Sequence, residues 1–150
     1  MPTGTTIAVA CDHAGLLLKR EIVAHLSARG VAFEDLGTNT PESVDYPDFA
    51  AAVARGVAEG TYRFGILVCG TGIGMSIAAN KFAGIRAATC TGEFEARVAR
   101  AHNDANILCL GGRVTGPGVA VGCVDLFLAT EFEGGRHARR VAKITALERG

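Results

Sequence analysis

Cys69 lies where an apolar run meets a glycine-rich segment, a setting in which a thiol can do chemistry. The run Phe64-Gly65-Ile66-Leu67-Val68 leads into Cys69, and glycines follow at alternate positions, Gly70, Gly72 and Gly74. A helix-forming segment comes next, from Met75 to Lys81. A helix amino terminus aimed at a thiol favours the thiolate, which can act as a base or a nucleophile. The alternative is that Cys69 is a small buried hydrophobe, which suits the other four cysteines.

The glycine loop can present backbone N–H groups to an anion, or it can be a tight strand-to-helix turn. Its spacing is G-x-G-x-G, whereas a dinucleotide fingerprint is G-x-G-x-x-G. A P-loop would end in Gly-Lys-Ser/Thr, but Met75 follows Gly74. A cysteine-dependent phosphatase would need an arginine a few residues after Cys69, and the sequence has none there. The pattern favours an anion-binding loop of another kind.

Histidines and arginines form the second set of candidates. His13 follows Asp12 at a predicted strand end, and His102 closes a predicted helix beside Asn103. Gly134-Gly135-Arg136-His137-Ala138-Arg139-Arg140 is a basic cluster at a predicted helix start, where cations oppose the helix dipole. Arg136 and Arg140 share a helix face and could clamp a phosphate, or they form a solvated surface cluster. The chain has no Cys-x-x-Cys motif, so we expect no metal site.

Strands and helices alternate along the chain, which predicts an α/β fold with a parallel sheet covered on both faces. We expect one domain, 1–150, with a five-stranded sheet in a Rossmann-like three-layer sandwich. On the helix 16–28, Leu16, Leu18, Ile22 and Leu26 should face inward, and Lys19, Arg20 and Glu21 largely outward. The predicted strands are 6–11, 31–36, 64–69, 85–89 and 107–110, and the predicted helices are 16–28, 47–59, 72–82, 93–102, 117–130 and 136–148.

Polar clusters fall where the strands end, and ligands of such sheets bind there. These clusters are Cys11-Asp12-His13, Asp45-Tyr46-Pro47, Cys69-Gly70-Thr71-Gly72 and Gly112-Arg113. His102-Asn103-Asp104 instead precedes the fifth strand. A plain doubly wound topology therefore places His102 at the opposite end of the strands from Cys69.

Composition excludes several classes of function. Hydrophobic residues make up 49% of the chain and charged residues 20%, and the formal net charge is +0. This balance argues against a nucleic-acid or membrane surface, and no apolar stretch is long enough to span a bilayer. Met1-Pro2-Thr3-Gly4 shows no basic n-region or apolar h-region. Five cysteines, an odd number, are expected to be free thiols in a reducing cytoplasm.

Taken together, these motifs resemble type B ribose-5-phosphate isomerase, a family that includes galactose-6-phosphate and allose-6-phosphate isomerases. The resemblance covers nearly the whole chain, in order. It is carried by Cys11 to Gly15, Asp45-Tyr46-Pro47, Cys69 to Gly74, Ala78 to Lys81, His102 to Asn106, Gly112-Arg113 and Gly134 to Arg140.

The resemblance implies aldose–ketose isomerisation of a sugar phosphate, without metal or organic cofactor. Cys69 would be the base that moves a proton between C2 and C1 through a cis-enediolate. Some members carry a glutamate at the position of Met75 instead, so this chain resembles the cysteine branch. Backbone N–H groups of the loop, Gly70, Thr71, Gly72, Ile73 and Gly74, would stabilise the enediolate oxygen.

The remaining roles also follow from the resemblance. His102, together with Thr71, would assist ring opening by proton transfer. Asp12 and Asn103 would bind sugar hydroxyls, and Tyr46 would line the sugar ring. The phosphate would be held by His13, Arg113, Arg136 and Arg140.

Members of the family are dimers or dimer-based tetramers. We therefore expect a homodimer whose carboxy-terminal helix reaches the partner and whose sites combine Cys69 of one subunit with His102 of the other. Two alternatives stay open from the sequence. One is a hexose-6-phosphate isomerase of the same family, and the other is a flavodoxin-like module that binds a sugar phosphate or nucleotide without catalysis.

Overall fold

The computed structural model describes residues 6–148. Residues 1–5, on which the prediction of no secretory signal rests, and residues 149–150 of the predicted domain lie outside the described residues. Five parallel strands form one sheet in the order β2-β1-β3-β5-β4. The strands are β1 (Ile7–Cys11), β2 (Phe33–Asp35), β3 (Gly65–Cys69), β4 (Ala87–Thr89) and β5 (Ile107–Gly111).

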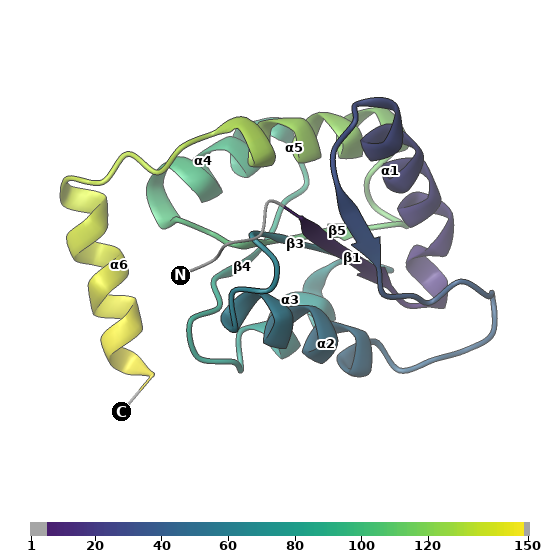
Figure 1. Cartoon of the computed structure of the whole chain (residues 1–150), viewed down its shortest axis with the longest axis horizontal. Coiled ribbons are helices and arrows are strands. Elements are labelled where there is room, and N and C mark those ends of the chain that lie inside the picture. Colours follow the sequence, from purple (N-terminus) through teal and green to yellow (C-terminus); the bar gives the residue numbers. More distant parts are fainter. Residues whose placement is uncertain (1–5, 149–150) are drawn as a thin grey trace.

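Helices cover both faces of this sheet, which confirms the three-layer α/β sandwich. Figure 1 shows α1, α4 and α5 on one face and α2 and α3 on the other. The helices are α1 (Leu16–Ala28), α2 (Tyr46–Ala58), α3 (Ile73–Ala79), α4 (Glu93–Asn103), α5 (Pro117–Ala129) and α6 (Arg136–Leu147), and a short 3₁₀ helix, η1 (His13–Gly15), precedes α1.

The three central strands are buried along their whole length, because helices cover both of their faces. Their side chains alternate between two cores, as the pleat of a strand requires. In β1, Ile7 and Val9 pack with α1, α4 and α5, whereas Ala8 and Ala10 pack with α2 and α3. This arrangement fixes the carboxyl ends of β1 and β3 side by side.

The two edge strands are shorter than predicted. β2 pairs with β1 over three residues, not along 31–36, and β4 pairs with β5 over three residues, not along 85–89. An edge strand has a neighbour on one side only, so its pattern of apolar residues extends beyond the part that is hydrogen-bonded. The predicted helix 72–82 is also too long, since α3 ends at Ala79.

Lys19 corrects the prediction for the outer face of α1. Its side chain is 1% exposed, although its helix position suggested solvent. The ammonium donates to Asp35 Oδ1 at 2.7 Å, to the carbonyl of Thr38 at 2.6 Å and to Asn39 Oδ1 at 2.7 Å. All three donor positions are therefore used, which offsets the loss of hydration. The connection after β2 covers this face of the helix.

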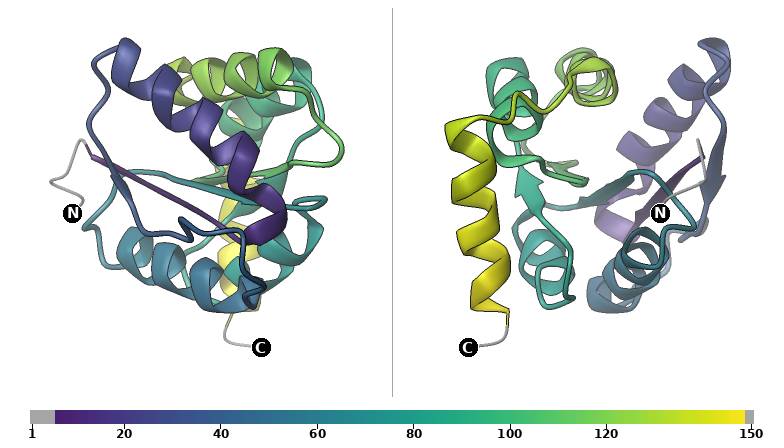
Figure 2. Two further views of the ribbon diagram at one scale, coloured as in Figure 1. Left: turned by 90° about the vertical axis from the view of Figure 1, so that its right-hand side faces the viewer. Right: turned by 60° about the vertical axis from the view of Figure 1, so that its left-hand side comes forward.

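The last helix, α6, lies outside the two helical layers. It stands along one side of the molecule next to α4 and β4 (Figures 1 and 2). Its contacts within the chain include that of His137, whose ring is stacked on that of His102 at the end of α4. Contact of this helix with a partner stays a prediction. None of the helices within residues 6–148 is long and apolar enough to cross a bilayer.

Candidate active site

A crevice opens at the carboxyl ends of β1 and β3. After β1 the chain continues to β2 on one side of the sheet, and after β3 it continues to β4 on the other side. The connections that leave β1 and β3 therefore run in opposite directions, which leaves room between them for a ligand. All four predicted strand-end clusters contribute to it. Its volume is about 480 Å³, and it is lined by Asp12, His13, Ala14, Tyr46, Cys69, Gly70, Thr71, Ile73, Gly74, Ile77 and Arg113.

Cys69 is the last residue of β3 and pairs with Gly111 of β5, so its position is set by the sheet. The backbone N–H of Gly72 donates to its Sγ at 3.1 Å. Gly72 adopts φ 81°, a left-handed conformation that glycine tolerates best. The turn that begins α3 is thereby folded back onto the thiol. A donor aimed at sulfur stabilises negative charge there.

The loop after Cys69 offers further donors to a ligand. Thr71 Oγ1 accepts from the N–H of Ile73 at 3.2 Å. Within residues 6–148, the N–H groups of Gly70, Thr71 and Gly74 have no acceptor in the chain. Gly74 is in close contact with the ring of Tyr46, since a Cβ there would lie 2.5 Å from a ring carbon. Tyr46 is thus held against the loop and lines the crevice, and its contact with the sugar ring stays a prediction.

Three polar residues line the crevice together with Cys69. Asp12 is buried and accepts from the N–H of Gly15 through Oδ1, at 3.1 Å. His13 Nδ1 accepts from the N–H of Val44 at 3.2 Å, so a neutral ring carries its proton on Nε2. The backbone N–H of Arg113 donates to Gly70 O at 2.9 Å, which fixes that residue beside the loop. The crevice therefore combines a thiol with two groups that suit an anion.

The other predicted site residues lie elsewhere in the chain. His102 and Asn103 end α4, and Arg136 and Arg140 are exposed on α6. None of these four lines the crevice. α4 leads into the amino-terminal end of β5, while Cys69 pairs with Gly111 at its carboxyl end. A five-residue strand is roughly 13 Å long, so the end of α4 and Cys69 lie at opposite ends of the strands.

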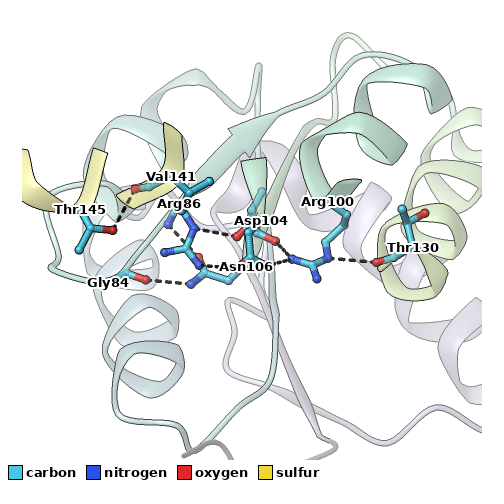
Figure 3. A network of polar contacts seen from close by, with 9 residues as sticks. Gly84, Arg86, Arg100, Asp104, Asn106, Thr130, Val141 and Thr145 are labelled. Atoms are coloured by element: carbon cyan, nitrogen blue, oxygen red, sulfur yellow. Dashed lines mark hydrogen bonds and ion pairs between the residues drawn. The ribbon is translucent and has the colours of Figure 1, made fainter. Parts of the chain in front are cut away.

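A polar network anchors the chain just after His102 (Figure 3). Asp104 pairs with Arg86 at 3.3 Å and with Arg100 at 2.8 Å. Arg100 also donates to the carbonyl of Thr130, which follows α5, at 3.3 Å. Asn106 bonds the backbone of Gly84 and Arg86. The end of α4 is therefore tied to the end of α5, next to the segment that leads into α6.

His102 is stacked on His137, which sequence reasoning placed in the basic cluster without a role of its own. The two rings are 5° from parallel with centroids 4.2 Å apart. Each Nε2 lies 3.8 Å from Glu133 Oε1. Burial, followed by the charges of His102 and Arg136, lowers the pKa of His137 below its ordinary value.

One group of His, Cys, Asp and Glu side chains in the described residues brings three ligand atoms within 4.8 Å of one another. It consists of His102, Glu133 and His137. Because the two ring planes are parallel, the in-plane lone pairs of the two Nε2 atoms lie in separate planes and do not converge on one ion.

The family is decided by comparison with known proteins. The model for "Ribose/Galactose Isomerase" matches residues 7–144. This chain belongs to the ribose/galactose isomerase family. It is 54% identical to ribose-5-phosphate isomerase B of Escherichia coli over 142 residues, 95% of either chain.

Solved structures agree with this assignment. Ribose-5-phosphate isomerase B of Clostridium thermocellum superimposes with a TM-score of 0.94 at 54% identity, covering 96% of this chain and 97% of that one. The enzyme of Mycoplasma genitalium with bound ribulose-5-phosphate gives a TM-score of 0.92 at 44% identity, with 96% of each chain covered. The family fold and the α/β sandwich derived from the sequence are therefore the same.

Proposed function

We propose that this protein interconverts ribose 5-phosphate and ribulose 5-phosphate through a cis-enediolate. The observation that carries the proposal is Cys69, held at the end of β3 with a backbone N–H on its sulfur, in a crevice that contains His13 and Arg113. The relatives named ribose-5-phosphate isomerase B, at 54% identity over most of the chain, support the same reaction.

The reaction needs the sugar ring to open first. The C1–O4 bond breaks, O4 takes up a proton, and the hydroxyl on C1 loses its proton as the aldehyde forms. Cys69 then removes the C2 proton and returns it at C1. Loss of the C2 proton puts negative charge on O1, where the N–H groups of Gly70, Thr71 and Gly74 can donate to it. O1 is then protonated and the O2 hydroxyl loses its proton, so that the C2 carbonyl of the ketose forms as C1 takes up the returned proton.

We assign the proton donor for ring opening to His102 of a partner subunit. Within one chain His102 and Cys69 lie at opposite ends of the strands. The crevice therefore lacks an imidazole from His102 until a second copy of the chain supplies it. Arg136 and Arg140 would arrive with His102 and complete the phosphate site, and Asn103 would bind a hydroxyl. Asp12 keeps Oδ2 available for another hydroxyl.

Exposed apolar side chains support such an interface. Ile73 and Ile77, one helical turn apart at the rim of the crevice, are 57% and 60% exposed. Ile144 and Leu147 of α6 line a second cavity, about 490 Å³, beside β4. Apolar surface of this kind is typical of contact sites. A cytoplasmic homodimer or dimer-based tetramer is the assembly that we propose.

The test is proton exchange in deuterated water, followed by NMR. Wild type should exchange the C2 proton of ribose 5-phosphate and form ribulose 5-phosphate, and Cys69→Ala should do neither while keeping its fold. Undiminished exchange by Cys69→Ala would overturn the role of the thiol. Parallel rates on allose 6-phosphate and galactose 6-phosphate decide the sugar, and binding without turnover would indicate a non-catalytic module.

A further inference from the structure

The stack of His102 on His137 joins two helix ends of opposite polarity. His102 lies in the last turn of α4, where the helix dipole favours a positive charge. His137 lies in the first turn of α6, where the dipole disfavours one. Contact between two imidazoles also opposes double protonation, because like charges at this distance repel. Both features therefore disfavour a positive charge on His137.

Solvent and neighbouring charges act in the same direction. The side chain of His102 is 41% exposed and can be hydrated when charged, whereas that of His137 is 11% exposed. Arg136 and Arg140 on α6 disfavour a further cation at His137. Glu133 lies equally close to both rings and favours one positive charge between them. Asp104, the other acid near the end of α4, is already paired with Arg86 and Arg100.

The backbone keeps the three groups together. The N–H of Glu133 donates to the carbonyl of Ala101 at 3.0 Å, and that of His137 donates to Gly134 at 3.0 Å. The Arg100 contacts to Asp104 and Thr130 fix the two chain segments on which His102 and Glu133 stand. A parallel ring on one face of His102 then limits its rotation.

We propose that His137 is a positioning residue, which holds the ring of His102 in one plane for proton transfer. This inference rests on the proposed function, in which His102 protonates O4 during ring opening. His137 itself would not touch the substrate. Its loss should slow the opening of the sugar ring and leave the later proton transfer at Cys69 intact.

Two measurements separate these steps. Turnover of ribose 5-phosphate includes ring opening. Exchange of the C1 protons of ribulose 5-phosphate does not, because its C5 oxygen carries the phosphate and the ketose is open-chain. We expect His137→Ala to lower turnover of ribose 5-phosphate roughly 10-fold, part of the 10²- to 10⁴-fold typical of general acid–base catalysis, with exchange from ribulose 5-phosphate within about twofold of wild type.

Two further variants complete the test. His137→Phe keeps a flat ring on His102 and should restore most of the turnover. His25→Gln is the control, because His25 pairs with Asp125 on a different part of the fold; it should change neither rate.

The reference variant is His102→Asn. If it slows turnover of ribose 5-phosphate and His137→Ala does not, the positioning role is wrong and the proposed function stands. Equal losses in both measurements for His137→Ala would also overturn the positioning role, since a general structural defect affects both. If His102→Asn leaves turnover unchanged, the role of His102 fails, and the inference fails with it.

Discussion

The backbone N–H of Gly72 donates to Sγ of Cys69 at 3.1 Å, three residues along the chain. This bond depends on φ 81° at Gly72, which turns the chain from β3 into α3. A change in the backbone of the loop should therefore alter the hydrogen bond to the sulfur.

Gly72→Ala should lower turnover roughly 100-fold. A Cβ would lie 3.1 Å from the backbone of Leu110, so the loop must move and the donor leaves the sulfur. Gly84→Ala is a matched control, because Gly84 has φ 82° and nothing within 4 Å of a Cβ. Both variants should lose about 1–3 kcal/mol of stability from the strained φ. Steady-state kinetics and urea unfolding would check this, and equal turnover of the two variants would contradict it.

Alkylation should distinguish Cys69 from the other thiols. Burial raises the pKa of Cys11 to about 11 and that of Cys90 to about 12, and it also raises the pKa of Cys109 and Cys123. These four stay protonated near neutral pH, and only the thiolate reacts quickly. Iodoacetamide should label Cys69 first, with loss of activity, and ribose 5-phosphate should protect it. Peptide mass spectrometry would locate the label; a faster label on another cysteine in the folded protein would be inconsistent with this reading.

Buried thiols should also destabilise the fold at alkaline pH. Burial raises the pKa of Cys123 from 9.0 to about 11. Stability from this group is complete below pH 9.0, where the unfolded thiol is protonated, and is lost as pH rises towards 11. The free energy of unfolding should fall by up to about 1.4 kcal/mol per pH unit from this group. Urea unfolding of wild type and Cys123→Ala at several pH values would measure the difference in slope, and identical slopes would rule it out.

Arg136→Ala and Arg140→Ala should each raise KM for ribose 5-phosphate and change kcat little. Each loses a charge-assisted bond to phosphate, about 1.5–3 kcal/mol, or roughly 10- to 150-fold. Arg139→Ala is the matched control on the same helix, since Arg139 is exposed and has no assigned role. Wild-type KM values in both test variants would place the phosphate elsewhere.

Cys69→Ala and His102→Ala should complement each other in mixed dimers. One site of a mixed dimer carries both changes, and the other carries neither. With random exchange about half of the dimers are mixed, so about a quarter of wild-type activity should return after co-refolding in equal amounts. Mixed dimers confirmed by native mass spectrometry but no more active than the parents would mean that both residues serve the same subunit's site.

The sequence alone predicts the alternation of strands and helices and the place of Cys69 at the carboxyl end of a buried strand. These features depend on local patterns of apolar residues and glycines, which neighbouring residues alone produce. It also brought Asp12, His13, Tyr46 and Arg113 to one crevice, because parallel strands end at a common edge.

The partners of a buried polar side chain depend on how distant segments pack in the folded protein. Lys19 was predicted to face solvent from its helix position, but Asp35, Thr38 and Asn39 arrive from another segment and pair with it. His102 and His137 are 35 residues apart, and their stack exists because the network around Arg100 and Asp104 brings the ends of α4 and α5 together. A periodic pattern gives the side of a helix that faces the core, whereas the partners of its polar residues come from distant segments and depend on how those segments pack.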